Sequence, residues 1–568
     1  MPSFASTALT LAAIVGTTSA APAKVHDRSV PTGSPVVTVK NGSYYGIHND
    51  NYNQDFFLGI PYSQAPVGDL RFSKPEPLDT TWEELRAATE YQPKCYGYGS
   101  DSDGFEQSED CLFINIVRPS GYEDTQLPLA LWIHGGGFYM GGATDDRYNL
   151  TFIVENSVAI GKPIMAASIA YRLSAFGYLN SEEVAETGSL NAGLKDQRLA
   201  LHWIQENIGA FGADPEKVTI WGESAGALSV GFHLVAYGGR NDKLFRAAVM
   251  ESGNPIFYTS LNQTSDFQPI YDDMVEDLGC SGKDSLACIK ALDVEKIDQL
   301  LKTKPAYQQA FLPAIDGVFV ANYTSQQLAS GDFVHVPIID GTNSDEGTLF
   351  SPMGIDTEDQ LKEMMSTTSF LQPGLPAALV EKLMAVYTTD EYNMPNDLSF
   401  GSDDVLGMPF GEHWRHSASY YGDHHFIAAR RLTCQTWAAA GLDAYCFRFD
   451  TVPRGLGWPF QAAHFQEVSF VFNNVDGLGY SPSPFLDMSP AFAQLSNHMS
   501  KTWASFVADL NPNSWKGVDA ALPLWPTYDN ADPKNFVFSA NETCYTETDD
   551  FRAEGIKLFN DNTVLFRK

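Results

Sequence analysis

The sequence predicts an α/β protein built on a large, mostly parallel central β-sheet that is flanked by helices. Short apolar runs bounded by turn residues predict buried strands at 127–133, 163–170, 217–221, 245–251, 335–340 and 444–449. Amphipathic stretches predict helices between several of these strands, at 191–208 and from residue 225 onward. Strands that alternate with helices imply parallel crossover units, which is why the sheet is expected to be mainly parallel.

The second half of the chain carries more helical pattern than the first. Residues 355–440 contain several such stretches, and we expect them to form an inserted helical cap over the C-terminal edge of the sheet. No Pro-, Gly- or Ser-rich linker divides the chain after residue 36. We therefore expect residues 37–568 to form a single catalytic domain.

The N-terminal residues predict export from the cell. Residues 1–20 are expected to be a signal peptide, because an apolar run at 8–15 precedes small residues that suit cleavage near Ala20. Residues 21–36 are rich in Pro and Ser and predict a flexible segment. No later stretch reaches the roughly 18–20 apolar residues of a membrane span. We expect a secreted, extracellular protein with no integral membrane association.

Cysteines and glycosylation sequons agree with that compartment. The seven cysteines include two closely spaced pairs, Cys95/Cys111 and Cys280/Cys288, that suit local disulfides. The pairing of Cys434, Cys446 and Cys544 stays open, and the odd count leaves at least one thiol, which we expect to be buried and inert. Five sequons predict glycosylation acceptors at Asn41, Asn149, Asn262, Asn322 and Asn541.

The charge of the chain argues against two classes of partner. The formal net charge is −34, from 36 Lys and Arg against 70 Asp and Glu. A field of that sign repels nucleic acid and anionic membrane surfaces. It could also steer cationic substrates, although solubility is the commoner reason for an acidic surface.

Ser224 is the candidate nucleophile. It lies in Gly222-Glu223-Ser224-Ala225-Gly226, between a predicted strand and a predicted helix. In that context G-x-S-x-G predicts a strained turn that lifts the serine hydroxyl above the sheet, and the flanking residues must be small to avoid clashes. The alternative is a tight turn without chemistry.

A glycine-rich loop predicts the oxyanion hole. His134-Gly135-Gly136-Gly137-Phe138 follows the predicted strand 127–133. Acyl transfer needs backbone N–H donors close to the developing oxyanion, and we expect these from Gly136, Gly137 and Ala225. A phosphate-binding loop is the alternative, but the chain has no G-x-x-x-x-G-K-[ST] sequence.

The serine needs a histidine base and a carboxylate that orients it. His464 is the best candidate base, since it follows a turn-rich segment after the predicted strand 444–449. Asp340, Asp345 and Glu346 all qualify as the acid, and spacing does not choose among them. A metal cluster remains a weaker alternative for the histidines at 413, 416, 424 and 425, for which surface positions are the simpler interpretation.

Together these residues resemble the type-B carboxylesterase/lipase family, which includes the cholinesterases, and most of all its secreted fungal members. The similar segments span the chain from about residue 37: FFLGIPYSQAPVGDLRF, SEDCLFINI, HGGGF, NAGLKDQRLAL, VTIWGESAGA, SDEGTLF and HFQEVSFVF. The resemblance implies an α/β-hydrolase fold and a Ser–Glu–His triad with Glu346 as the acid. It implies neither a metal nor an organic cofactor.

The resemblance implies supporting residues as well. Ser252 matches a serine that hydrogen-bonds the acid, and Glu223 is expected to support the site from beside the nucleophile. The family's salt bridges would join Arg71 to Glu109 and Arg172 to Asp196, and its disulfides match the two cysteine pairs given above.

One departure from the family bears on the substrate. In its fungal lipases the first disulfide loop is long and forms an amphipathic lid, whereas the loop from Cys95 to Cys111 is short, polar and acidic here. The loop also lacks the Trp with which cholinesterases bind choline, and Tyr96, Tyr98 or Phe105 would have to replace it. We expect an esterase for soluble, short- or medium-chain esters. Lipase or sterol esterase is the nearest rival; choline-ester hydrolysis, a non-catalytic binding protein and an amidase are more remote.

Overall fold

The computed structural model describes residues 31–368, 372–392, 410–457, 459–515 and 523–568. The predicted signal peptide (1–20) and most of the predicted flexible segment (21–36) lie outside the described residues. The first strand begins at Val36.

An 11-stranded mixed sheet organises the chain. From one edge to the other its strands are β3 (Ile47–Asn49), β4 (Gln54–Pro61), β8 (Phe113–Pro119), β10 (Met165–Ile169), β9 (Leu127–Ile133), β11 (Ala213–Glu223), β12 (Ala247–Glu251), β13 (Ile338–Asn343), β14 (Ala444–Phe449), β15 (Lys534–Phe538) and β16 (Tyr545–Thr548). Every neighbouring pair from β10 to β15 is parallel, while β3, β4 and β8 at one edge and β16 at the other pair antiparallel. The predicted fold class is confirmed.

Four observed strands differ in bounds from their prediction. The strands expected at 163–170 and 245–251 are shorter, at Met165–Ile169 and Ala247–Glu251, and two others end later than expected. The strand expected at 335–340 runs from Ile338 to Asn343, because its parallel register with β14 continues to the pair Asn343–Phe449. The strand expected at 217–221 extends to Glu223, where Glu223 still pairs with Glu251 of β12. Both extensions carry the chain further toward the carboxyl edge of the sheet.

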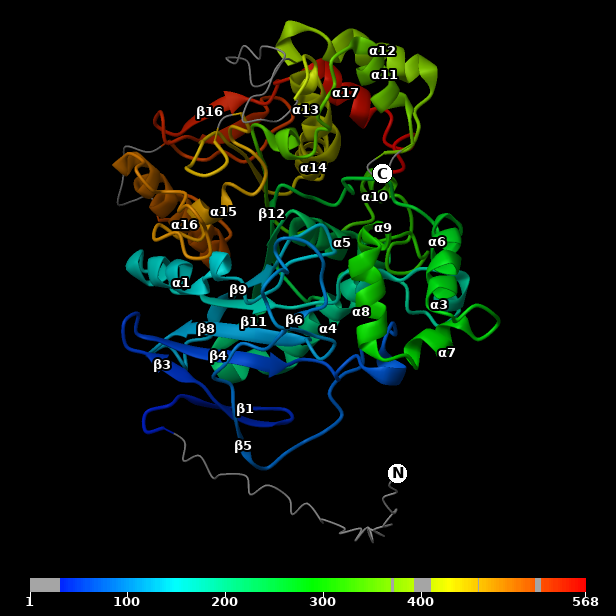
Figure 1. Ribbon diagram of the computed structural model, residues 1–568. Coiled ribbons are helices and arrows are strands. Elements are labelled where there is room, and N and C mark those ends of the chain that lie inside the picture. The colour runs from blue at the N-terminus through cyan, green and yellow to red at the C-terminus, as the bar shows by residue number, and fades with distance from the viewer. Residues whose placement is uncertain (1–30, 369–371, 393–409, 458, 516–522) are drawn as a thin grey trace, which may run out of the picture.

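Successive side chains of each strand point to opposite faces of the sheet, so apolar strands build a core on each face. In β9, Leu129, Leu131 and Ile133 belong to one buried cluster, and Ala130 and Trp132 belong to the other. Helices α4 and α5 pack over the first face, and α1 and α16 pack over the second (Figure 1). The result is a three-layer arrangement with the sheet in the middle.

The α-helices are α1 (Leu150–Ala159), α2 (Ser174–Tyr178), α3 (Glu182–Glu186), α4 (Ala192–Asn207), α5 (Ala225–Gly239), α6 (Thr264–Asp277), α7 (Ser285–Lys290), α8 (Val294–Thr303), α9 (Pro305–Gln308), α10 (Thr324–Ser330), α11 (Glu358–Ser366), α12 (Ala377–Tyr387), α13 (Trp414–Gly422), α14 (Ala428–Ala439), α15 (Val468–Val471), α16 (Pro490–Asp509) and α17 (Ala553–Asn560). A π-helical turn, Asp423–Ile427, joins α13 to α14. A small separate sheet holds β1 (Val36–Val39), β2 (Gly42–Tyr45) and β5 (Leu85–Ala87), and β6 (Lys94–Cys95) pairs with β7 (Gln107–Ser108).

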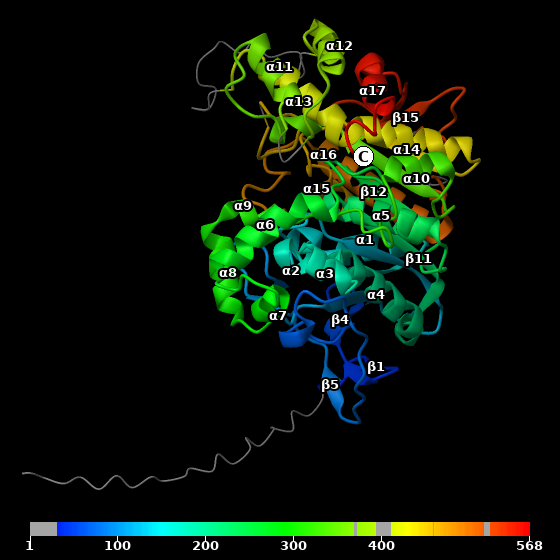
Figure 2. The same cartoon turned by 90° about the vertical axis from the view of Figure 1, so that its right-hand side faces the viewer.

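The region expected to form a helical cap divides into two parts. Helices α11, α12 and α13 share a separate apolar cluster with α17, at the end of the molecule opposite β1 and β5 (Figures 1 and 2). Helix α14 instead packs on β13 and β14, and its Cys434 and Trp437 belong to the core of the sheet. The end of the predicted cap is therefore a sheet-flanking helix, because its apolar stripe is buried against strands.

Disulfides and buried ion pairs tie the loops to this frame. The pairs Cys95–Cys111 and Cys280–Cys288 are disulfide-bonded. A third disulfide, Cys434–Cys446, joins α14 to β14, and the seventh cysteine, Cys544, is buried.

Both ion pairs implied by the family resemblance are present and buried. Arg71 Nε lies 2.5 Å from Glu109 Oε1, and Arg172 Nη2 lies 2.7 Å from Asp196 Oδ1.

The sequons differ in accessibility. Asn322 and Asn541 are exposed, and Asn149 and Asn262 are partly exposed. Asn41 is buried and its amide donates to the carbonyl of Thr80, so the folded chain covers this acceptor. Among the described helices, none combines the length and the apolarity that crossing a membrane requires.

Candidate functional site

Ser224 occupies the turn between β11 and α5. Its backbone has φ 55° and ψ −124°, a conformation that L-residues rarely adopt and that needs support from its surroundings. The support comes from two backbone hydrogen bonds: Ser224 N–H donates to the carbonyl of Glu251, at the end of β12, and its own carbonyl accepts from Leu228 N–H. The serine is thereby held at the carboxyl edge of the sheet.

The glycines on either side of Ser224 are required by close packing. A Cβ atom on Gly226 would lie 2.0 Å from the carbonyl oxygen of Ile133, and one on Gly222 would lie 2.4 Å from the backbone carbon of Gly226. Real Cβ atoms do not approach other atoms so closely, so the turn can form only with glycine at both positions.

The glycine loop after β9 lies beside Ser224. Gly136 has φ 100° and Gly137 has φ 61°, and the loop closes on itself because Met140 N–H donates to the carbonyl of Gly136. In this structure the backbone N–H groups of Gly136, Gly137 and Ala225 make no hydrogen bond to the described residues. All three residues line the same cavity as Ser224, so three donors are available beside the hydroxyl.

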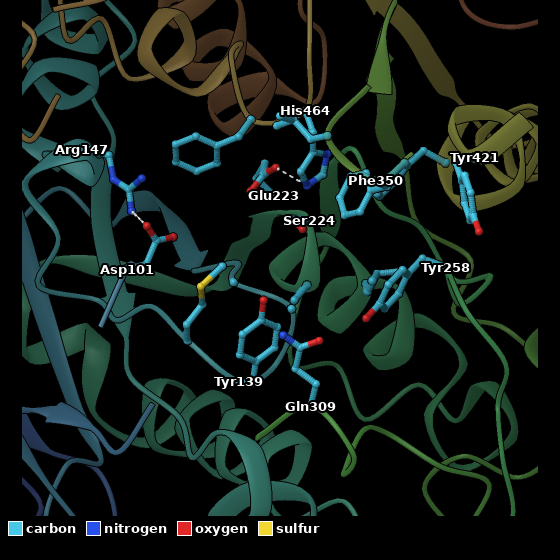
Figure 3. Close-up of a pocket in the computed structure, with 18 of the residues that line it drawn as sticks. Asp101, Tyr139, Arg147, Glu223, Ser224, Tyr258, Gln309, Phe350, Tyr421 and His464 are labelled. Carbon is cyan, nitrogen blue, oxygen red and sulfur yellow. Dashed lines mark ion pairs between the residues drawn. The ribbon is translucent and has the colours of Figure 1, made fainter. Parts of the chain in front are cut away.

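His464 lies above Ser224 (Figure 3), and its ring also contacts Glu346. The distance from His464 Nδ1 to Glu346 Oε2 is 2.7 Å, across 118 positions of sequence. A carboxylate can only accept, so Nδ1 carries the proton and Nε2 is the basic nitrogen of the neutral ring. Phe426 stacks on the ring with centroids 4.7 Å apart, and Phe350 meets it edge-on at 5.1 Å.

Glu346 is fully buried, and both of its oxygens are hydrogen-bonded. Oε1 accepts from Ser252 Oγ at 2.5 Å and from Asn343 N–H at 2.7 Å, and Oε2 accepts from His464. Three donors suit an ionised carboxylate in a dry site. Of the other acids that spacing allows, Asp345 instead accepts from Ala462 N–H, and both oxygens of the buried Asp340 lack a hydrogen-bond partner.

Two more buried glutamates surround this pair. Glu223 Oε1 lies 3.3 Å from His464 Nε2, and Asn343 Nδ2 donates to Glu467 Oε2 at 2.5 Å. Burial, and then the charges of Glu467 and Glu346, raise the pKa of Glu223 well above its usual range. Burial, followed by the charge of Glu346, raises the pKa of Glu467 to about 7. The raised pKa favours the neutral form of Glu223, and Glu346, which accepts three hydrogen bonds, is the partner of His464 Nδ1.

Ser224 Oγ and His464 Nε2 do not hydrogen-bond to each other in this structure, and Nε2 faces Glu223 instead (Figure 3). Hydrogen bonds between a nucleophile and its base are commonly long without substrate and shorten when substrate binds. Both residues line one cavity of about 580 Å³, a size that suits a small organic ligand.

The cavity includes residues that the sequence pattern did not single out. Asp101 and Arg147 lie on one side of Ser224, and Phe350, Tyr421 and Tyr258 lie on the other (Figure 3). These side chains come from five separate segments, so only the folded chain brings them together. No local motif marks any of them.

The first disulfide loop is attached to the body of the protein at several points. Asp101 Oδ1 lies 2.9 Å from Arg147 Nη2, Lys94 Nζ donates to the carbonyl of Asp101, and Ser102 Oγ accepts from Gly141 N–H. Tyr96, Tyr98 and Phe105, the possible substitutes for a choline-binding Trp, do not line the cavity. Phe105 instead lies under Lys94 Nζ, 3.2 Å from the ring centroid.

The four clustered histidines are mostly buried rather than on the surface. His413 Nδ1 and His416 Nδ1 are 3.2 Å apart, whereas His424 and His425 lie in the π-helical turn among aromatic rings. No group of three or more metal-ligating side chains occurs within the ranges that the structure describes.

The raised pKa of Glu467 predicts a pH-dependent stability. Folding favours the neutral carboxyl of Glu467. The stabilisation of the folded state by this group is therefore complete below about pH 4.5 and is lost as the pH rises to about 7. Glu467→Gln should remove this pH dependence. The free energy of unfolding of the variant, relative to that of the native protein, should therefore rise by about 2–3 kcal/mol between pH 4.5 and 7.5. Urea unfolding at both pH values measures the difference. Glu363→Gln, at an exposed position of α11, is the control and should show no such change.

Comparison with known proteins identifies the family. The carboxylesterase family model matches residues 33–554. Secreted lipase 1 of Botryotinia fuckeliana (strain B05.10) is 32% identical over 562 residues, covering 91% of this chain and 92% of that protein. Lipase 2 of Diutina rugosa is 36% identical over 435 residues, covering 70% and 77%. The crystal structure of Aspergillus niger EstA matches with a TM-score of 0.80 and 28% identity, covering 94% of this chain and 99% of that one. With this fold, and a serine, a histidine and a glutamate gathered at the carboxyl edge of its sheet, the chain belongs to the carboxylesterase family of serine hydrolases.

Proposed function

We propose that this protein hydrolyses carboxylic esters through an acyl-enzyme intermediate on Ser224. The observation that carries the proposal is the 2.7 Å contact between His464 Nδ1 and the fully hydrogen-bonded carboxylate of Glu346, in the cavity that also holds the strained Ser224. In this assignment His464 is the general base and acid, and Glu346 fixes its tautomer.

The reaction follows from these positions. Nε2 of His464 takes the proton of Ser224 Oγ as the oxygen attacks the ester carbonyl. The oxyanion receives hydrogen bonds from the N–H groups of Gly136, Gly137 and Ala225, which are not otherwise engaged. His464 then gives its proton to the leaving alcohol, and water, activated by the same nitrogen, releases the acid. Every step uses side chains and backbone of this chain together with water.

Substitution of the proposed nucleophile and of the proposed acid tests the assignment. Ser224→Ala should lower kcat/KM on p-nitrophenyl butyrate by about 10⁴-fold or more, because the nucleophile is lost. Glu346→Gln should lower it by about 10³–10⁴-fold, since an amide can donate to Nδ1 and stabilise the wrong tautomer.

Ser252→Ala is the matched control, because it removes one hydrogen bond to Glu346 and leaves the triad intact; its loss should be about tenfold. Thermal unfolding of each variant separates chemistry from misfolding. Undiminished hydrolysis by folded Ser224→Ala would exclude this mechanism.

We propose soluble esters with short or medium acyl chains as the preferred substrates. The first disulfide loop supports this, because it is polar and is attached through Asp101 and Ser102 to Arg147 and Gly141. A loop held in this way offers little apolar surface to an oil interface. Triacylglycerol lipase activity is the second candidate, favoured by the two relatives named as lipases.

A series of p-nitrophenyl esters from acetyl to palmitoyl separates the two candidates. We expect the highest kcat/KM at short or medium chain length, and rates that saturate smoothly as each ester passes its solubility limit. A sharp rise in rate at that limit with the long-chain esters would assign the protein to the lipases instead.

We further propose that the protein is secreted and that residues 37–568 form one catalytic domain. Three disulfides support an oxidising compartment, and one similar protein is named a secreted lipase. The exposed sequons at Asn322 and Asn541 are the best-placed glycosylation acceptors.

A further inference from the structure

The two sides of the active-site cavity differ in chemistry. One side is formed by the ion pair Asp101–Arg147, and the other by the aromatic rings of Tyr258, Phe350 and Tyr421 (Figure 3). An ester has two parts, the acyl group and the alcohol. In the tetrahedral intermediate they extend in different directions from the carbonyl carbon. Each side of the cavity can therefore bind only one of these two parts.

The position of the proton donor determines which side takes the alcohol. The leaving oxygen must receive its proton from Nε2 of His464, so the alcohol lies on the Nε2 edge of the ring. That edge faces Glu223 at 3.3 Å, while Phe426 and Phe350 pack around the rest of the ring. The alcohol therefore leaves toward the side of Glu223 rather than toward the aromatic rings.

The polar side adjoins that edge. Phe465 follows His464 directly, and the guanidinium of Arg147 lies over its ring, 4.8 Å from the centroid. Arg147 and Asp101 thus extend the surface that begins at Glu223 and His464, and all of these residues line the cavity. The aromatic side is left for the acyl chain, which suits its apolar surface.

The ion pairs of the polar side hold equal numbers of cations and carboxylates. Arg147 binds Asp145 through Nε at 3.0 Å and Nη2 at 2.8 Å, and Nη2 also reaches Asp101. Lys94 Nζ lies 3.8 Å from Asp145. Two cations therefore face two carboxylates.

Burial opposes the ionisation of Asp145, but the hydrogen bonds and charge of Arg147 outweigh it and lower the pKa of this carboxyl, so Asp145 stays charged at neutral pH. Nη1 of Arg147 makes no hydrogen bond within the described ranges, which leaves its donors for a ligand.

We propose that this site selects esters of neutral, hydroxyl-rich alcohols, such as glycerol- or sugar-like groups, carrying an apolar acyl chain. The inference rests on the proposed ester hydrolysis and adds the class of alcohol. Asp101 accepts from an alcohol hydroxyl and Arg147 donates to one. A site built to hydrogen-bond hydroxyl groups discriminates against an analogue that lacks them, because its polar groups are then left without partners. Because its charges are balanced, the ion pair does not attract a charged alcohol as it attracts hydroxyl groups through hydrogen bonds.

A matched pair of butyrates tests the proposal with the full-length protein. Propyl butyrate and 2,3-dihydroxypropyl butyrate share the acyl group and the carbon skeleton of the alcohol, and differ by two hydroxyls. We expect kcat/KM to favour the dihydroxypropyl ester by about tenfold or more, mainly through KM. Active-site titration with a phosphonate gives the concentration of functional enzyme, and butyrylcholine supplies a cationic alcohol, which should be hydrolysed less efficiently than the dihydroxypropyl ester.

Four variants test whether the preference depends on the polar side. Asp101→Ala should reduce the ratio of kcat/KM between the two butyrates by about tenfold. Asp103→Ala, an exposed acid in the same loop, is the matched control and should keep the native ratio. Arg147→Met should abolish the preference, and Asp101→Asn, which keeps an acceptor, should retain part of it.

Three results would overturn the proposal. These are a native preference for propyl butyrate, an unchanged ratio in Asp101→Ala, or hydrolysis of butyrylcholine faster than of both neutral esters. Failure of the proposed function itself appears differently, as undiminished hydrolysis of both butyrates by Ser224→Ala.

Discussion

The site depends on how closely the turn after β11 passes the end of β9. The backbone of Gly222 and Gly226 lies against the carbonyl of Ile133, at distances that leave no room for a Cβ atom. This contact forces Ser224 into its strained conformation and brings the start of α5 next to the glycine loop that follows β9. Ser224, the proposed nucleophile, and the N–H groups proposed to bind the oxyanion therefore take their positions from a single contact between two neighbouring parallel strands, β9 and β11.

The carboxyl groups around His464 differ in the number of hydrogen bonds that they accept. Glu346 accepts three hydrogen bonds, one of them from His464 Nδ1. By contrast, Glu223 Oε1 has only the 3.3 Å contact with His464 Nε2, and Glu467 Oε1 has no hydrogen-bond partner among the described residues. Burial with few donors favours the neutral acid, and burial with several donors favours the anion. Within one cluster of glutamates, three donors hold Glu346 beside His464, while burial favours the neutral forms of Glu223 and Glu467. Mutual repulsion among the carboxyls reinforces the division.

Local sequence pattern was enough for the parts of the site that one segment encodes. The strand at 127–133 is observed with the predicted bounds, and the turn at Ser224 and the loop at Gly136 and Gly137 follow from glycines at fixed offsets. The acid was not accessible to the same reasoning. Asp345 and Glu346 are adjacent in the sequence, and only the folded chain shows that Asp345 meets Ala462 whereas Glu346 meets His464. The family resemblance supplied that choice, as it did the two ion pairs.

The remaining features are tertiary and left no pattern in the sequence. The Cys434–Cys446 disulfide requires α14 to lie on β14, where the helical pattern of residues 355–440 suggested a cap. The polar side of the cavity requires the first disulfide loop to meet Arg147 beside Phe465. Charged residues in such loops ordinarily face solvent, so sequence alone gave no reason to place Asp101 in the cavity.

The structure of a covalent adduct with a p-nitrophenyl alkylphosphonate tests the central claim most directly, because the bound phosphoryl group mimics the tetrahedral intermediate. The account predicts phosphorus bonded to Ser224 Oγ, with the phosphoryl oxygen about 2.7–3.1 Å from the nitrogens of Gly136, Gly137 and Ala225, and with His464 Nε2 within hydrogen-bond reach of Ser224 Oγ and the leaving-group position. Phosphorus bonded to another residue, or a phosphoryl oxygen directed away from all three nitrogens, would contradict it.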